Sequence, residues 1–367
     1  MLKQKYFLTG IFILSAERQP IKLAWRKIVW LQMKYYPYLD TLKGIAILLM
    51  VMGHVIPWTL GEADFLHCSL YELHGNQFFS SLVYKIIYSF HMPLLFFVSG
   101  FLFYKSGINH DRHYLKDCLN RRVHRILIPY LMTGSLLWIG RGHWGYWFLQ
   151  CLFFLNVIVG ICFYLTDTFS LKKQKEIFLY LIVFVVLFLI GKLLPNLESS
   201  TNGIVVIGKL VNFYPAFLMG VLFRKYDGLK QFFQNDYCST SCLILYLVLF
   251  SVSCIKAIPY FTFISSFVMP LCMIVFLNAL FVNKTKLWGG VNIVGKYSLE
   301  IYILHIFYVM VFNEVGTFIL TIDSIFTNIT FQIVYSFILS VVAIILSILT
   351  ADFLKGSKAL KRLLFGL

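Results

Sequence analysis

The sequence predicts an all-α fold, a polytopic bundle of about ten transmembrane helices with both chain ends in the cytoplasm. Hydrophobic residues form 59% of the 367-residue chain, charged residues form 13%, and the mean hydropathy is +0.79. A soluble chain of this length could not bury so much apolar surface in one or two cores. Apolar runs long enough for a hydrocarbon core of about 30 Å recur along the chain. The expected spans lie near residues 38–58, 83–104, 126–141, 145–165, 176–194, 204–223, 238–256, 260–282, 297–316 and 329–354.

Basic residues gather on one side of these spans. Twenty-six of the 32 Lys and Arg residues lie in the N-terminal segment, in every second loop and in the C-terminal tail. The alternate loops 59–82 and 317–328 contain neither residue type. Because Lys and Arg are enriched in cytoplasmic loops, both chain ends are expected in the cytoplasm. Topology therefore explains the formal net charge of +16, and no nucleic-acid partner is expected.

The chain divides into three expected parts. Residues 1–33 form a basic extension that begins like a short signal sequence, although Met33 offers an alternative start codon. Residues 34–355 form the transmembrane domain, and residues 356–367 form a basic cytoplasmic tail. The eight cysteines show neither a disulfide arrangement nor a metal-ligand spacing, so no metal site is expected. High Ile, Phe and Lys usage favours a bacterium with an AT-rich genome, and hence its plasma (inner) membrane.

The first expected span carries three ionisable residues, Asp40, Lys43 and His54. Charged groups cost roughly 2.5–3.5 kcal/mol or more at the bilayer centre, so this span is expected to line a polar cavity. A helix places Lys43 and His54 about 16 Å apart along its axis. That separation suits a site that holds one end of a long ligand and performs chemistry at the other. An ion pair with Asp40 is an equally favoured role for Lys43.

A pair of arginines opens the third expected span. Arg122 and Arg125 are three residues apart, so a regular helix directs both side chains the same way. Guanidinium groups bind phosphate through two hydrogen bonds, which makes the pair a candidate phosphate clamp on the cytoplasmic side. The alternative is a cluster of positive charge that only keeps the loop in the cytoplasm.

The order and spacing of these motifs resemble the acyltransferase-3 family of membrane proteins, in its sugar and polysaccharide O-acetyltransferase branch related to fucose 4-O-acetylases. The family's Lys/Arg-x10-His signature corresponds to Lys43 and His54, and its Arg-x-x-Arg motif to Arg122 and Arg125. Further segments are similar to the family's helices, namely FHMPLLFFVSG at 90–100, ILIPY at 126–130, WFLQCLFF at 147–154, FYPAFLMGVLF at 213–223 and GKYSLEIYILH at 295–305.

The resemblance implies acetyl-CoA as acyl donor, bound from the cytoplasm, and a glycan or lipid-linked sugar as acceptor at the outer side of the lipid bilayer. Arg122, Arg125 and Lys43 would hold the CoA phosphates while the pantetheine arm extends toward His54. An imidazole titrates near neutral pH, which suits His54 as the general base for a sugar hydroxyl. The alternative is a helix histidine bonded to a neighbouring carbonyl.

Two further candidates lie in the second expected span. His91 precedes Met92 and Pro93, and a proline frees a backbone carbonyl that can open a local pocket. His91 is therefore expected to bind the acceptor or to orient His54, with packing as the alternative. Ser99 is a candidate donor to the thioester oxygen of the acyl-CoA, although Ser-Gly pairs more often permit close helix approach.

Asp40 and four residues of later spans complete the candidate site as substrate contacts. The four are Trp147, Gln150, Glu300 and His305. Glu300 is costly to bury without a partner, and it lies five residues from His305, away from the same helical face. Trp147 and Gln150 lie one turn apart, where an aromatic residue at the membrane interface is the alternative.

These observations predict a membrane O-acetyltransferase that modifies a surface polysaccharide or its lipid-linked precursor. Direct transfer is expected, since no nucleophile has an obvious activating partner. A multi-pass secondary transporter of a small polar or anionic solute is the alternative, because intramembrane charges also occur there. The concentration of ionisable residues in the first third of the chain favours the enzyme.

Overall fold

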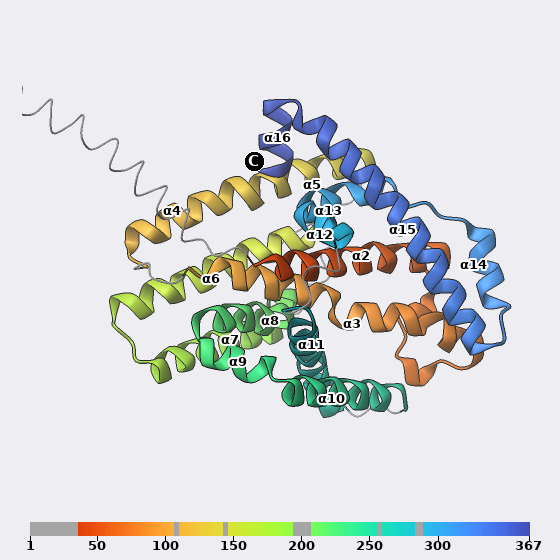
Figure 1. Cartoon of the computed structure of the whole chain (residues 1–367), viewed down its shortest axis with the longest axis horizontal. Coiled ribbons are helices and arrows are strands. Elements are labelled where there is room, and N and C mark those ends of the chain that lie inside the picture. The colour runs from red at the N-terminus through yellow and green to blue at the C-terminus, as the bar shows by residue number, and fades with distance from the viewer. Residues whose placement is uncertain (1–35, 106–109, 142–145, 194–206, 256–258, 283–288) are drawn as a thin grey trace, which may run out of the picture. The chain divides into compact units, whose positions relative to one another are not determined.

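The structure is a computed structural model, and it describes residues 36–105, 110–141, 146–193, 207–255, 259–282 and 289–367. Within these ranges every regular element is a helix, and seven helices are long and apolar enough to cross a membrane. The seven are α2 (Pro37–Thr59), α3 (Gly75–Phe103), α6 (Trp147–Thr168), α7 (Lys173–Leu193), α10 (Asp236–Ile255), α11 (Pro259–Val282) and α15 (Ile325–Lys355). The expected helical membrane bundle is confirmed (Figure 1). The extension 1–33 lies outside the described residues.

Two expected spans are shorter helices, α5 (Ile128–Arg141) and α8 (Ile207–Lys225). The helix α4 (Arg112–Arg122) runs into α5 through a π turn, Val123–Leu127. Turns of this type are rare and often occur at functional sites. Arg122 ends α4 and Arg125 lies inside the π turn, so their relative direction differs from that on a regular helix.

The helices α2 and α3 form the core of the compact unit Tyr38–Leu367. In the most apolar stretch of each of these helices, 72% of residues are buried, against 11% in α7 and in α10. The faces of α7 and α10 are therefore available to lipid, whereas α2 and α3 are enclosed by protein. The ionisable residues of α2 consequently lie inside the bundle, as membrane energetics require.

Two glycines allow α3 and α8 to cross in close contact. A Cβ atom at Gly100 of α3 would overlap the carbonyl oxygen of Phe217 in α8. In the reverse direction, a Cβ atom at Gly220 of α8 would overlap the carbonyl oxygen of Phe97 in α3. Small residues at such positions are the usual means of close helix approach in membranes.

The ninth expected span, a continuous helix over 297–316, is wrong. The chain there forms α13 (Ser298–Leu304), the 3₁₀ turn η6 (His305–Phe307) and, after an irregular stretch, α14 (Asn313–Leu320). The irregular stretch reads Tyr-Val-Met-Val-Phe, whose β-branched and aromatic residues have low helix propensity. The hydroxyl of Tyr308 also bonds Thr350 in α15, which ties the stretch to another helix.

A short helix, α12 (Gly289–Lys296), precedes α13 and packs along α2 (Figure 1). Thr41 Oγ1 donates to Asn292 Oδ1 at 2.5 Å. A Cβ atom at Gly295 would overlap the carbonyl oxygen of Asp40, so the two backbones touch. From this contact α13 leads to His305, which lies beside His54 near the other end of α2.

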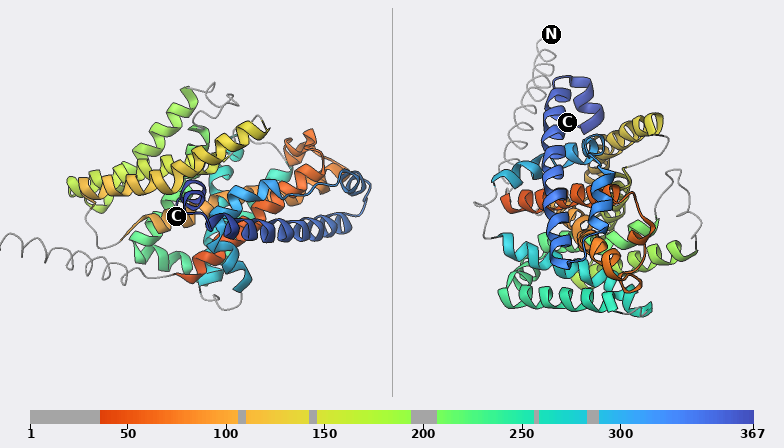
Figure 2. Two further views of the ribbon diagram at one scale, coloured as in Figure 1. Left: turned by 90° about the horizontal axis from the view of Figure 1, so that it is seen from above. Right: turned by 90° about the vertical axis from the view of Figure 1, so that its right-hand side faces the viewer.

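The remaining elements close the bundle. The turns η1 (Asp64–Leu66) and η2 (Leu70–Glu72) lie between α2 and α3, and α9 (Asp227–Gln234) lies between α8 and α10. The long helix α15 packs against α3 and α13, and it is dark blue in Figure 2. The expected basic tail contains α16 (Lys358–Phe365), which packs on α5 and buries Phe365.

Candidate active site

A cavity of about 190 Å³ lies near the C-terminal end of α2. Its wall is built by α2, α3, α6, α13 and η6. The lining residues are Met50, His54, Tyr88, His91, Met92, Tyr146, Trp147, Tyr302, His305 and Ile306. Four residues chosen from the sequence therefore meet here, although they come from distant parts of the chain: His54, His91, Trp147 and His305.

His54 lies against two other rings of this cavity region. Its ring centroid is 5.2 Å from that of His305, with 33° between the ring planes. The Trp58 ring centroid lies 5.5 Å away on the other side of the contact, one turn along α2. No hydrogen bond joins a His54 nitrogen to the part of the chain that the structure describes. Both imidazole nitrogens are thus available to a ligand in the cavity.

His91 and His305 are held by their own helices in the same way. His91 Nδ1 lies 2.7 Å from the carbonyl oxygen of Ile87, and His305 Nδ1 lies 2.9 Å from that of Ile301. A carbonyl oxygen only accepts, so Nδ1 carries the proton in each ring. In the neutral imidazole, Nε2 then has the lone pair. Each ring is fixed in orientation and offers a hydrogen-bond acceptor.

Aromatic side chains form much of the remaining wall. Tyr88 packs edge-on against His91, with centroids 4.9 Å apart. Trp147 stacks on Phe213 at 5.4 Å, and the Lys209 ammonium lies 4.3 Å from the Trp147 ring centroid. Stacking and the cation–π contact hold the indole in one position. The cavity thus has rigid, apolar faces beside its imidazole groups.

Tyr146 enters the cavity from a strained backbone position. Its φ of 66° is in the left-handed region, which is unfavourable for an aromatic residue. The Tyr146 hydroxyl donates to the carbonyl oxygen of Ile303 at 2.7 Å, and the Phe148 amide donates to the Tyr302 hydroxyl at 3.2 Å. These bonds fix the start of α6 to α13. Strain of this kind is typically found at functional sites.

Sequence reasoning missed several lining residues, although a signal for some of them exists. Tyr88 precedes His91 by three residues, Tyr302 precedes His305 by three, and Met50 precedes His54 by four. Residues at these spacings share a helix face, so the neighbours of each candidate histidine would have been found. Tyr146 offers no such signal, since its place depends on the left-handed turn before α6.

Near the N-terminal end of α2, Lys43 forms an ion pair with Asp40. The ammonium nitrogen lies 2.6 Å from Asp40 Oδ1, and the two side chains are 21% and 10% exposed. Both lie in the same continuous helix as His54, so the axial separation of Lys43 and His54 remains about 16 Å. The ion pair is one of the two roles expected for Lys43, and it leaves part of the ammonium exposed.

Positive charges gather around the two arginines of the π turn. The Arg122 guanidinium lies 5.1 Å from the ring centroid of Phe103, and Arg125 is exposed. Burial, followed by the nearby charges of Arg121, Arg122 and Arg125, lowers the pKa of Lys105 below its ordinary value. The nearby positive charges would favour an anion at this place.

Besides Asp40, Lys43 and the two arginines, three further candidate residues do not line the cavity. Glu300 forms an ion pair with Lys355 at 2.7 Å. Gln150 lies one turn into α6 beyond Trp147, outside the lining residues. Ser99 directly precedes Gly100, at the crossing of α3 with α8. The acceptor and donor contacts expected of these residues stay predictions.

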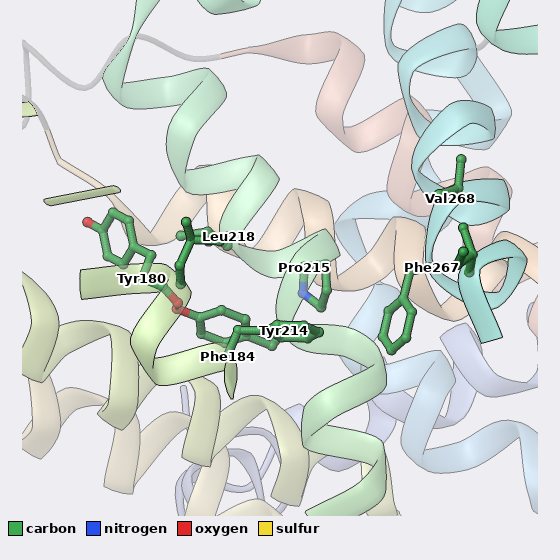
Figure 3. A pocket seen from close by; sticks show the side chains of 9 residues that line it. Tyr180, Phe184, Tyr214, Pro215, Leu218, Phe267 and Val268 are labelled. Carbon is green, nitrogen blue, oxygen red and sulfur yellow. The ribbon is translucent and has the colours of Figure 1, made fainter. Parts of the chain in front are cut away.

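A second cavity, of about 350 Å³, lies between α7, α8 and α11 (Figure 3). Its lining side chains are aliphatic or aromatic. The two tyrosine hydroxyls among them are already bonded, since Tyr180 donates to Glu176 at 2.6 Å and Tyr214 to the carbonyl oxygen of Tyr180 at 3.1 Å. This cavity is larger, but the histidine cavity carries side chains that can accept and donate protons, so it is the candidate active site.

One known protein family matches most of the chain. A family model described as "Acyltransferase domain" (Acyl_transf_3) matches residues 36–352. The chain is also similar to the nodulation protein NolL of Mesorhizobium japonicum, with 29% identity over 99 residues. That similarity covers 27% of this chain and 23% of NolL, so it spans about a quarter of the relative's length. No solved structure matches the chain.

Proposed function

The chain belongs to the acyltransferase-3 family of membrane proteins, and from this premise we propose that it is an O-acetyltransferase using cytoplasmic acetyl-CoA. The acceptor is a hydroxyl of a surface polysaccharide or of its lipid-linked precursor, and the protein acts in the plasma (inner) membrane of a bacterium. The observation that carries this proposal is the meeting of His54, His91 and His305 in one cavity with aromatic walls.

His54 acts as the general base in this reaction. Its imidazole removes the hydroxyl proton of the acceptor as that oxygen attacks the thioester carbonyl carbon. A carbon–oxygen bond forms, the carbon–sulfur bond breaks, and the CoA thiolate receives the proton that His54 had taken. Atoms and charge balance without an acyl-enzyme. The unbonded nitrogens of His54 support this role, because a base must be able to reach its substrate.

The donor binds at the opposite end of α2. Arg122, Arg125 and the exposed part of Lys43 contact its phosphates, with Lys105 adding a further positive charge. Guanidinium groups suit phosphate because they donate two parallel hydrogen bonds. The pantetheine arm then extends about 16 Å, the axial separation of Lys43 and His54, to bring its thioester to the cavity.

The acceptor enters the cavity itself. Sugars have apolar C–H faces as well as hydroxyl groups, and binding sites for small polar ligands combine aromatic walls with a few polar contacts. Trp147 and Tyr88 supply the walls, while His91 and His305 supply hydrogen-bond acceptors. Histidines also serve as proton relays in transporters, so consumption of acetyl-CoA, rather than this arrangement, separates the enzyme from the transporter alternative.

The experiment supplies radiolabelled acetyl-CoA to membranes that contain the protein, together with extracted glycans and glycolipids. Wild-type membranes are expected to label the acceptor, and His54→Ala is expected to lower the rate about 100-fold or more, as general-base loss does. His67→Ala is the matched control, since His67 is an exposed histidine of the loop after α2.

Retained CoA binding and an unchanged melting temperature in His54→Ala would show that the acetyl-transfer step fails, rather than donor binding or folding. Normal transfer by this variant would remove His54 as the base while leaving the reaction class intact. Failure of folded wild-type protein to consume acetyl-CoA with every extract would contradict the proposed donor and return attention to transport.

A further inference from the structure

One nitrogen of the cavity has no partner although it is buried. The His305 side chain is 4% exposed, and its Nε2 forms no hydrogen bond within the described part of the chain. Its Nδ1–H is already used by the carbonyl oxygen of Ile301, so Nε2 is the acceptor end of the ring. Buried polar atoms in proteins are nearly always paired. His305 lines the cavity, so an unpaired acceptor on its ring points to a ligand with a hydrogen-bond donor.

The charge of the lining narrows the class of that ligand. Of the ten lining residues that the structure describes, none is an acid, a lysine or an arginine, and Lys209, whose ammonium lies against the Trp147 ring, is not among them. An ionised group that enters an enclosed site without a partner pays a large desolvation penalty. The part of the ligand inside the cavity is therefore uncharged, and it donates to the imidazole rather than accepting from a cation.

The size of the cavity limits the ligand to one ring. Its volume of about 190 Å³ is below the roughly 300–1,000 Å³ of typical small-molecule pockets. It nevertheless exceeds the share of a single water, about 30 Å³, several-fold. One pyranose ring beside the aromatic side chains of Tyr88 and Trp147 meets both limits.

We propose that the acceptor enters as a single uncharged pyranose ring, and that the hydroxyl next to the one acylated donates a hydrogen bond to His305 Nε2. The inference rests on the proposed function, with His54 as the base for the acylated hydroxyl. The His54 and His305 rings lie 5.2 Å apart, close enough for two adjacent hydroxyls of one ring to reach one imidazole each. His305 thereby selects sugars with a free neighbouring hydroxyl.

Two substitutions separate this role from a structural one. In His305→Asn, the side-chain amide replaces the Nδ1–H that donates to Ile301, but no atom remains at the position of Nε2. In His305→Gln, the longer side chain places an oxygen acceptor near the position of Nε2 and loses the anchoring bond. The proposal expects His305→Asn to be the worse binder of acceptor, whereas a purely structural histidine would tolerate Asn better than Gln.

The probes are methyl pyranosides of gluco, galacto and manno configuration, their monodeoxy analogues and the corresponding methyl uronates. Binding to full-length protein in detergent is measured by titration calorimetry without any acyl donor. For wild type, at least one uncharged glycoside binds about tenfold or more tightly than its uronate. Removing one ring hydroxyl from that glycoside weakens binding about fivefold to tenfold in wild type but not in His305→Asn.

The inference would be overturned if only uronates bound, or if no uncharged glycoside bound. It would also be overturned if every deoxy analogue lost the same affinity in wild type and in His305→Asn. The melting temperature of His305→Asn shows whether this variant is folded. If it is unfolded, His305→Gln replaces it in the test. This variant should still bind the deoxy analogue more weakly than the parent glycoside. Uncharged glycosides that bind but never accept acetyl from acetyl-CoA would refute the proposed function and leave this site intact. Acetyl transfer restricted to uronates would overturn the inference of an uncharged ring and leave the proposed function intact.

Discussion

Glu300 of α13 and Lys355 at the end of α15 form an ion pair, with Oε1 and Nζ 2.7 Å apart. Glu300 is nearly buried and Lys355 is partly exposed, at 7% and 21% of the side chain. The pair ties the broken helix that carries His305 to the last long helix of the bundle. Glu300 was expected to contact substrate; in the structure its carboxylate pairs with Lys355, and the substrate contact stays a prediction.

Replacing Glu300 by Gln is expected to destabilise the fold by about 1–3 kcal/mol, because Lys355 loses its close, nearly buried partner. Thermal unfolding in detergent measures the loss. Asp352→Asn is the control, since Asp352 is half exposed and lies 3.8 Å from the same ammonium. A normal melting temperature with a large fall in kcat for Glu300→Gln would instead show direct participation in the reaction.

Gly100→Ala is expected to disrupt the crossing of α3 and α8, because the added methyl group would overlap the backbone of Phe217. Overpacking of this kind costs about 1–3 kcal/mol or more. The same change at Gly228, in the exposed helix α9 with open space around its Cα, is expected to be neutral or stabilising by up to about 1 kcal/mol. Melting temperatures of the two variants provide the comparison, and equal values would contradict the close contact.

Tyr146→Phe removes the hydroxyl that donates to the carbonyl oxygen of Ile303. The expected loss is about 1 kcal/mol of stability, together with a raised KM for the acceptor, since Ile303 lies two residues before His305. Tyr237→Phe, at a residue 87% exposed, serves as the control. Unchanged kinetics in Tyr146→Phe would show that the bond to α13 has no part in acceptor binding.

CoA binding is expected to weaken as the pH rises toward the lowered pKa of Lys105. Deprotonation removes one positive charge from the group around Arg122, so affinity is full below this pKa and falls above it. Lys105→Arg keeps its charge throughout and should bind CoA equally well from about pH 7 to about pH 10. Titration calorimetry of wild type, of this variant and of Lys116→Arg, a change at an exposed residue of α4, measures the effect.

For this prediction to hold, the pH dependence of CoA binding by Lys105→Arg must differ from that of wild type and of Lys116→Arg. If wild type and Lys105→Arg lose affinity in parallel, another group titrates. If neither loses affinity, Lys105 lies outside the donor site, and the positive charge at the π turn serves membrane topology alone.

Much of the fold follows from composition, because each long apolar run has to become a helix in a membrane. The first span illustrates this, since α2 covers 37–59 where 38–58 was expected. The break after His305 was not predictable from hydropathy, because the irregular stretch 308–312 is itself apolar. It depends on contacts such as that between Tyr308 and Thr350, which are 42 residues apart.

The candidate site was predictable where chemistry singles out a residue. A histidine within an apolar span is conspicuous, so His54, His91 and His305 were all found. Tyr302 and Tyr146 were not found, because tyrosine is common in this chain. Which tyrosines line a cavity depends on how the helices pack. Nor can sequence spacing show that Glu300 meets Lys355 rather than a ligand, because that choice is made by packing between distant helices.

The pairing of α2 with α12 and α13 has a consequence for how the protein is made. His54 is among the first residues of the bundle to leave the ribosome, and His305 follows about 250 residues later. At roughly 5–20 residues per second, some 12–50 s separate the two during translation. A nascent chain with most of its helices already inserted therefore still lacks one side of the histidine cavity. Activity in a cell should appear only once synthesis has passed α13, and chains that terminate early should be inert.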